Sequence, residues 1–173
     1  MMQGIARVST KQVRQFARNA PMWRKVKVTA DGAGWQCITH ADKHKIVTDE
    51  PAAAGGADEG PTPLHTALAA LTGCSEATAF SVSKNVLKLD LQKIEFDVEA
   101  KWDARAWIGK RDDNDNLVPA HFQHVKLVAK VTTPASQEQV DELASLVHQR
   151  CPIAAMFRQA ATVEEQWIKV DPQ

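Results

Sequence analysis

One segment of this sequence is apolar on almost every side of a helix, and it constrains the fold more than any other feature. From Pro63 onward, leucine and alanine recur three or four residues apart, as they do on a helix. The segment stays apolar around its circumference as far as Cys74, which is typical of a buried central helix. Thr62 can cap this helix, and proline suits its first turn. The pattern predicts a long buried helix that ends near Leu87.

Six shorter segments alternate apolar and polar residues, which is the pattern of a half-buried strand. They are residues 23–30, 35–39, 45–48, 94–102, 121–132 and 163–170. The first three precede the long helix and predict an antiparallel meander with a turn at 31–34, and the last three follow the helix. This order of strands, buried helix and further strands predicts an α+β fold with an antiparallel sheet.

Two more helices are expected between the last two strands. Ser136 and Gln139 have the spacing of a capping box, and the apolar residues that follow them recur at helical spacing. The pair Cys151-Pro152 interrupts this pattern and opens a short third helix, because proline is well tolerated in the first turn. Cys151 would then be the N-cap residue of that helix.

The chain divides into an N-terminal arm and one domain. Its 173 residues are enough for a single domain with a core of its own, which we expect over residues 22–173. Residues 1–21 form a basic arm that carries four basic and no acidic residues. We interpret this arm as a short amphipathic helix that ends at Pro21, although a mitochondrial transit peptide has the same composition.

The overall charge argues against two classes of partner. Lysine and arginine total 21, and aspartate and glutamate also total 21, so the formal net charge is zero. Proteins that bind nucleic acid or anionic membranes are usually basic, so neither partner is expected. The most apolar stretch, residues 64–82, is too polar to span a bilayer. The start of the chain does not have the pattern of a secretory signal, and three cysteines suit a reducing cytoplasm.

The cysteines are the candidates for chemistry. Cys151 would cap a helix, where backbone N–H groups and the helix dipole stabilise a thiolate. Cys74 lies inside the apolar helix, where burial would raise the pKa of its thiol. Local reasoning therefore ranks Cys151 as the more reactive of the two, and it also permits two inert buried thiols. Cys37, in a predicted strand, is expected to be a small core residue.

The residues around two of these thiols resemble a known family. Residues 55–74 read GGADEGPTPLHTALAALTGC, which resembles the OsmC/Ohr signature GG…GPxPxxxxxAALxxC. The pair Cys151-Pro152 resembles the Cys-Pro of the family's second motif. The resemblance extends over about residues 23–170 and includes the order of the elements. It implies an OsmC-like fold and an intertwined homodimer with two sites at the subunit interface.

The resemblance also implies a function. It is that of a cysteine-based peroxidase that reduces organic hydroperoxides in an antioxidant stress response, with no metal and no bound cofactor. Cys74 would be the peroxidatic cysteine and Cys151 the resolving one, which reverses the local ranking. The Cys74 thiolate would attack the peroxide and become a sulfenic acid, which Cys151 would convert into a disulfide. An external dithiol, in this family often a lipoylated protein, would then reduce the disulfide.

Some positions depart from the pattern of the family's peroxidases. Those proteins carry a glutamate directly after the proline of the motif, where this chain has Leu64 followed by His65. They also carry an arginine near the peroxidatic cysteine, and Arg24 is the best candidate here. His65 is nine positions before Cys74 and could reach it only across a dimer or a bend. Glu76 lies on a different side of the helix from Cys74 and is a further candidate for a supporting residue.

Three functional hypotheses remain open at this point. The chain is a peroxidase, or it is a weakly active or inactive OsmC-like dimer that binds an apolar small molecule at the subunit interface. In the third, a disulfide between the two motif cysteines only stabilises the fold. No metal site is expected, because the acidic segment 112–116 is not followed by the glycine and glutamate of a calcium loop. The histidine pairs also lack a supporting cluster of ligands.

Overall fold

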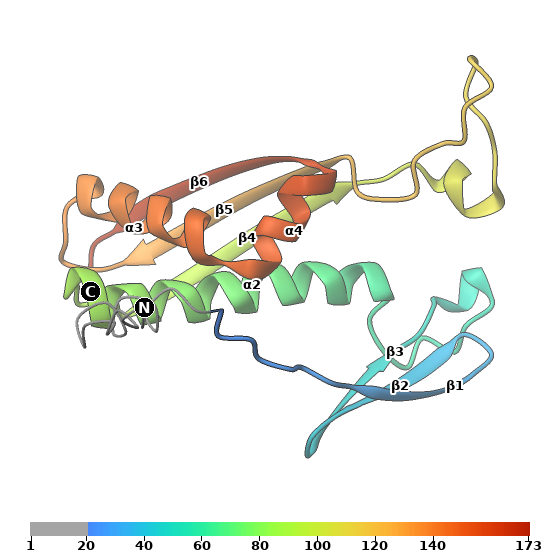
Figure 1. Cartoon of the computed structure of the whole chain (residues 1–173), viewed down its shortest axis with the longest axis horizontal. Coiled ribbons are helices and arrows are strands. Elements are labelled where there is room, and N and C mark those ends of the chain that lie inside the picture. The colour runs from blue at the N-terminus through green and yellow to red at the C-terminus, as the bar shows by residue number, and fades with distance from the viewer. Residues whose placement is uncertain (1–20) are drawn as a thin grey trace, which may run out of the picture.

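A single long helix, α2 (Pro63–Val82), runs across the middle of the molecule, with a three-stranded sheet on either side of it (Figure 1). The computed structural model describes residues 21–173, so the helix expected in the basic arm, residues 1–21, lies outside the described residues except for Pro21. The chain continues from α2 through one π-helical turn, Ser83–Leu87. The helix therefore ends where the sequence predicts.

The first sheet is an antiparallel meander, and its first strand differs from the prediction. Its strands are β1 (Thr29–Ala33), β2 (Gln36–Ala41) and β3 (His44–Thr48). The turn between β1 and β2 lies at residues 34–35, where Gly34 has a φ of 65°, a conformation that glycine adopts readily. The predicted strand at 23–30 and turn at 31–34 are therefore wrong. Because β2 ends one residue after the partner of Thr29, the described residues before β1 have no strand within residues 21–173 with which to pair.

The second sheet is mixed rather than antiparallel. Its strands are β4 (Lys93–Lys101), β5 (His124–Thr132) and β6 (Thr162–Val170), in the order β4-β5-β6. β4 and β5 are antiparallel, as expected, but β6 is parallel to β5. The prediction of an antiparallel sheet is corrected here, because two helices between β5 and β6 return the chain to the end of the sheet at which β5 began.

These two helices are α3 (Gln137–Arg150) and α4 (Pro152–Ala160). The predicted capping box of α3 is confirmed: Ser136 Oγ accepts from the Gln139 N–H at 3.3 Å, and Gln139 Oε1 accepts from the Ser136 N–H at 3.1 Å. Cys151 is the N-cap residue of α4, as predicted. Both helices pack against α2 and β6, and α2 itself also packs against β4.

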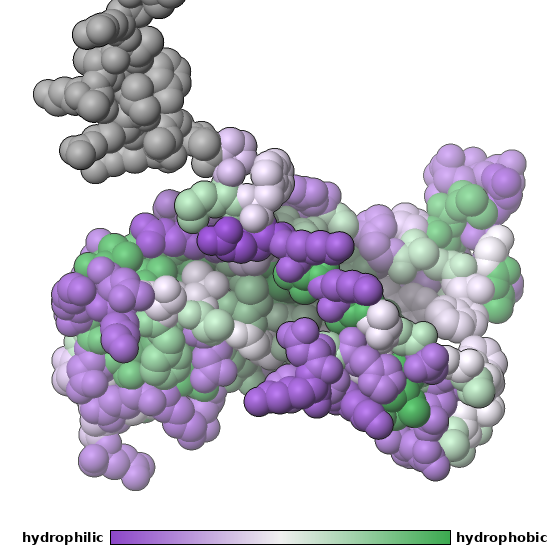
Figure 2. All heavy atoms as spheres, turned by 60° about the horizontal axis from the view of Figure 1, so that its bottom comes forward, coloured by the Kyte–Doolittle hydropathy of each residue, from purple (hydrophilic) through white to green (hydrophobic). Residues whose placement is uncertain are grey.

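The hydrophobic core lies where the inner face of the second sheet packs against the helices. Val125 and Leu127 of β5 meet Leu143 and Val147 of α3 there, all at most 2% exposed. Within one chain α2 buries only one face, since Phe80 on another face is 39% exposed. Hydrophobic side chains remain visible in the middle of the face drawn in Figure 2, bordered by hydrophilic ones. In residues 21–173, no helix combines the length and apolar character needed to cross a membrane.

Candidate thiol site

Two cysteines that are far apart in the sequence lie beside one another where α2 packs against the start of α4. Cys74 is half-buried in the middle of α2, and Cys151 is 1% exposed. The Cys151 side chain is among the groups that act most strongly on the Cys74 thiol. Both residues are free thiols in this structure. The sequence suggested the pairing only through a family resemblance, and the structure brings the two residues together.

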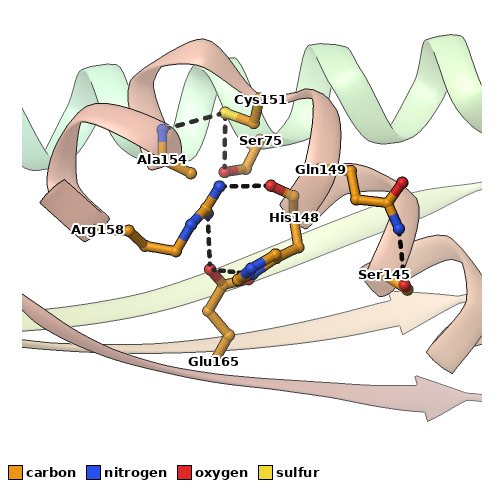
Figure 3. A network of polar contacts seen from close by, with 8 residues as sticks. All are labelled: Ser75, Ser145, His148, Gln149, Cys151, Ala154, Arg158 and Glu165. Carbon is orange, nitrogen blue, oxygen red and sulfur yellow. Dashed lines mark hydrogen bonds and ion pairs between the residues drawn. The ribbon is translucent and has the colours of Figure 1, made fainter.

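The sulfur of Cys151 has two polar neighbours. As the N-cap of α4, Cys151 Sγ accepts a hydrogen bond from the Ala154 N–H at 3.4 Å. The hydroxyl Oγ of Ser75, the residue after Cys74, lies 3.8 Å from Cys151 Sγ (Figure 3). Ser75 is 2% exposed. The sequence analysis did not single out Ser75, although a serine on the buried face of an apolar helix needs a hydrogen-bond partner and so carries a signal.

The electrostatic surroundings of Cys74 favour the neutral thiol. Burial raises the pKa of the Cys74 thiol, as expected from the sequence, and the neighbouring Cys151 raises it further. The backbone N–H of Ile153, in the first turn of α4, lowers it, because it stabilises the thiolate. The groups of residues 21–173 that act most strongly on this thiol include no cation. Within residues 21–173, the surroundings of Cys74 therefore favour the protonated thiol at neutral pH.

An ionic cluster lies next to the corner that carries Cys151. Arg158 of α4 donates from Nη2 to the backbone carbonyl of His148, in the last turn of α3, and its Nη1 lies 3.5 Å from Glu165 Oε1 of β6 (Figure 3). His148 Nδ1 is also 3.5 Å from that oxygen. The sequence analysis missed this cluster. Glu165 occupies an inward position of an alternating strand, where a charged side chain requires a partner, and this was the available signal.

The three supporting residues proposed from the sequence lie elsewhere within one chain. Arg24 is exposed in the segment before β1 and is not on a strand. His65 is exposed in the first turn of α2, with Nδ1 2.8 Å from the Thr62 hydroxyl. Glu76 is exposed on α2. None of the three is among the groups of the described chain that act most strongly on Cys74.

Cys37 and the possible metal ligands take no part in this site. Cys37 is half-buried in β2, with Sγ 3.9 Å from the Thr39 hydroxyl, and lies outside the core cluster. The prediction that Cys37 is a core residue is therefore wrong, because within residues 21–173 the first sheet contributes no side chain to the core cluster. No group of three or more histidine, cysteine, aspartate or glutamate side chains within residues 21–173 is arranged to hold a metal ion.

Leu64 stands at the start of α2 and borders two apolar hollows. One has a volume of about 340 Å³ and is lined by Leu64 together with Pro51, Trp102 and Trp107. The rings of the two tryptophans meet edge to face, 6.5 Å apart. The other hollow, of about 250 Å³, lies between Leu64 and Phe157 of α4. Leu64 thus places an apolar side chain at the position where the resemblance to the family's peroxidases led us to look for a glutamate.

Solved structures with the same fold come from several bacteria. An OsmC-like protein from Mycoplasma pneumoniae is 18% identical, with a TM-score of 0.72 over 86% of this chain and 99% of that one. An organic hydroperoxide resistance protein OsmC from Legionella pneumophila is 20% identical, with a TM-score of 0.62 over 86% and 99%. The organic hydroperoxide resistance protein OhrB of Bacillus subtilis is 22% identical, with a TM-score of 0.58 over 83% and 98%. No curated protein matches the sequence.

The family model described as OsmC-like protein matches residues 55–166. This match covers well over half of the chain and runs from the glycine-rich loop before α2 into β6. It includes both neighbouring thiols and the helices that carry them. With the fold shared by the bacterial structures, it shows that this chain belongs to the OsmC-like protein family.

Proposed function

We propose that this chain is a cysteine-based peroxidase that reduces organic hydroperoxides, with Cys74 as the peroxidatic and Cys151 as the resolving cysteine. The observation that carries the proposal is the meeting of these two thiols where α2 packs on α4. The names of the similar Legionella and Bacillus proteins, which are organic hydroperoxide resistance proteins, also support it.

The reaction follows from the two sulfur atoms. The Cys74 thiolate attacks the distal peroxide oxygen, so that an S–O bond forms, the O–O bond breaks, and the alkoxide leaves as an alcohol after taking up a proton. Cys74 is then a sulfenic acid. Cys151 attacks this sulfur and forms the disulfide, and the hydroxyl group leaves as water with the thiol proton. An external dithiol restores both thiols by exchange, and we propose a lipoylated protein for this role.

The surroundings of the thiols support the division of roles. Cys74 is half-buried and is therefore within reach of a peroxide, whereas Cys151 is 1% exposed and is shielded from one. The Ile153 N–H stabilises the Cys74 thiolate, and the Ala154 N–H binds the Cys151 sulfur. The first turn of α4 thus serves both sulfur atoms with adjacent backbone donors.

The proposal includes a homodimer. α2 is apolar on nearly every side, yet one chain covers only one of its faces. The segment before β1 also carries exposed apolar side chains: Trp23 is 86% and Val26 91% exposed. A second copy would cover both surfaces. Arg24 lies within this segment and remains our candidate for the cation that a partner chain supplies to Cys74.

A second candidate function is the binding of an apolar small molecule by a dimer with little or no peroxidase activity. The hollow of about 340 Å³ between Leu64, Trp102 and Trp107 favours it, because ligand pockets of this size are usually lined by apolar and aromatic side chains. In this alternative Leu64 would replace a carboxylate that peroxide reduction needs.

The deciding experiment is a titration of free thiols before and after one equivalent of an alkyl hydroperoxide. Wild type, Cys74→Ser and Cys151→Ser are compared, and Cys37→Ser serves as the matched control. We expect wild type and Cys37→Ser to lose two thiols quickly and Cys74→Ser to lose none. Cys151→Ser should accumulate a sulfenic acid that can be trapped.

The opposite results favour the other hypotheses. If wild type keeps its thiols for many minutes, the peroxidase proposal fails, and quenching of tryptophan fluorescence by apolar compounds becomes the next measurement. If the disulfide forms but resists a mild dithiol, it stabilises the fold and does not turn over.

A further inference from the structure

The corner that carries Cys151 is short and closely tied. α3 ends at Arg150 and α4 begins at Pro152, so Cys151 alone connects the two helices. Its N–H donates to the Val147 carbonyl at 2.9 Å, and its Sγ accepts from the Ala154 N–H at 3.4 Å. With both ends of the residue held by helices, the direction of the sulfur depends on how α4 is placed against α3.

Arg158 links the elements that set this placement. Its guanidinium lies on α4, binds the His148 carbonyl at the end of α3, and pairs with Glu165 of β6 (Figure 3). The carbonyls of the last helical turn have no partner within the helix, and a cation there interacts favourably with the helix dipole. One side chain thus joins two helices and a strand around Cys151.

The ion pair between Arg158 and Glu165 is less exposed to water than a typical surface ion pair. The Arg158 side chain is 22% exposed and the Glu165 side chain 16% exposed, so both charges are partly removed from water. A buried ion pair is weak evidence for stability, because desolvation offsets much of the attraction, but it fixes geometry. The planar guanidinium can bind a carbonyl and a carboxylate at the same time.

We propose that Arg158, together with Glu165, is a positioning residue for Cys151 and sets the rate at which Cys151 forms the disulfide with Cys74. The inference rests on the proposed function. In the resolving step the Cys151 sulfur attacks the sulfur of the Cys74 sulfenic acid. The S–S bond forms and the S–O bond breaks, so that Cys151 is oxidised, Cys74 is reduced, and the hydroxyl group leaves as water with the Cys151 proton. Arg158 acts on this step through the backbone of α4.

The test uses a reaction that needs no peroxide, so that its result is independent of peroxidase activity. In a Cys37→Ser background, the aromatic disulfide dithionitrobenzoate converts the more accessible Cys74 into a mixed disulfide and releases one thionitrobenzoate. Cys151 then attacks the Cys74 sulfur of this mixed disulfide and releases the second thionitrobenzoate. The absorbance of the second release gives the rate of the intramolecular step.

Four variants separate positioning from general stability. Arg158→Met keeps the length of the stem and removes both polar contacts, Arg158→Lys keeps the charge, and Glu165→Gln keeps the shape of the carboxylate. The matched control is Arg105→Met, because Arg105 also pairs with an acid, Asp103, but on an exposed turn outside this corner.

Arg158→Met should slow the second release by about tenfold or more, since small displacements of reacting groups have effects of this size. Glu165→Gln should slow it less, Arg158→Lys should recover part of the wild-type rate, and Arg105→Met should match wild type. A merely structural role would lower the melting temperature without changing this rate. The proposal is overturned if folded Arg158→Met releases the second thionitrobenzoate at the wild-type rate. If that variant does not fold, an unchanged rate in Glu165→Gln overturns it.

Discussion

The two sheets of this molecule have the same number of strands, but only one of them has a core. Apart from Val118, in the loop before β5, the buried hydrophobic side chains of the described chain form one cluster of the helices α2, α3 and α4 and the sheet of β4, β5 and β6. In β1, β2 and β3 no side chain is buried, and the apolar Ile46 of β3 is 43% exposed. Helices cover the second sheet, whereas the first sheet contributes no residue to the core cluster.

The difference between the two sheets shows which parts of the candidate site one chain provides and which parts it does not. Cys74 and Cys151 come together in the half of the molecule that contains the hydrophobic core, because α2 and α4 both pack there. The charge that would activate Cys74 is not among the groups of the described chain that act most strongly on it. In the function we propose, the half that contains the core supplies the geometry of the sulfur chemistry. A second copy would complete the electrostatics through the exposed first sheet and the segment before it.

The largest expected effect compares two isomeric side chains, one in each half. Leu143→Ala removes a side chain that is 1% exposed in the core, so it should lower the free energy of unfolding by about 2–5 kcal/mol. Ile46→Ala in the first sheet should cost less than about 1 kcal/mol. Denaturant unfolding of both variants and of wild type provides the measurement.

Equal losses in the two variants would contradict the contrast between the sheets. They would mean that another copy of the chain buries β3 as deeply as the core buries Leu143. In that case the melting temperature of Ile46→Ala should also rise with protein concentration, because association stabilises the folded state by mass action.

The second prediction concerns Asp49, which follows β3 and is 1% exposed. Its burial opposes ionisation, but hydrogen bonds from the backbone N–H groups of Glu59, Glu50 and Ala57 together lower the pKa of its carboxyl. In Asp49→Asn the amide nitrogen cannot accept the bonds that one carboxylate oxygen accepts. The variant should melt at a lower temperature than wild type, by less than Leu143→Ala does.

The melting temperature at acidic pH provides a second test of Asp49. Because the folded pKa of Asp49 is lowered, its contribution is complete above the unfolded value of about 3.9 and is lost as the pH falls through the folded value. The difference in melting temperature between wild type and Asp49→Asn should therefore be constant near neutral pH and shrink in acid. A difference that stays the same in acid would show that the carboxylate charge has no part in holding the loop.

Most elements of the fold could be predicted from the sequence, because local rules set them. The helix from Pro63, the capping box at Ser136 and the N-cap at Cys151 each depend on residues within a few positions of one another. The strand predicted at 23–30 was wrong because a strand needs a neighbour, and β2 ends too early to supply one. The parallel pairing of β6 likewise depends on the path of α3 and α4 and not on any local pattern.

The site was less predictable than the fold. Local reasoning identified the helix terminus at Cys151, but it could not show that the adjacent Ile153 N–H acts on Cys74, since that depends on the packing of α4 against α2. Arg158 and Glu165 escaped notice for the same reason. A charged residue on an amphipathic helix usually faces water, and only the third dimension shows that this one reaches the end of α3.

The last prediction concerns how the alkylation rate of Cys74 depends on pH. It tests whether the half that contains the core determines the reactivity of this thiol alone or with the exposed segment of a second copy. Burial and the neighbouring Cys151 raise the pKa of this thiol, and the thiolate is the reactive form. Without a cation from a partner chain, alkylation of Cys74 by iodoacetamide, followed in Cys37→Ser by mass spectrometry, should therefore speed up by about tenfold per pH unit, and the rise should continue past the usual thiol value of about 8.5. A plateau already at neutral pH is the outcome that the proposed dimer predicts, since it requires a cation beside Cys74 that the described chain does not place there. Arg24→Met should then restore the steep profile if the exposed segment before β1 of a partner chain supplies that cation, and should leave the plateau unchanged if it does not.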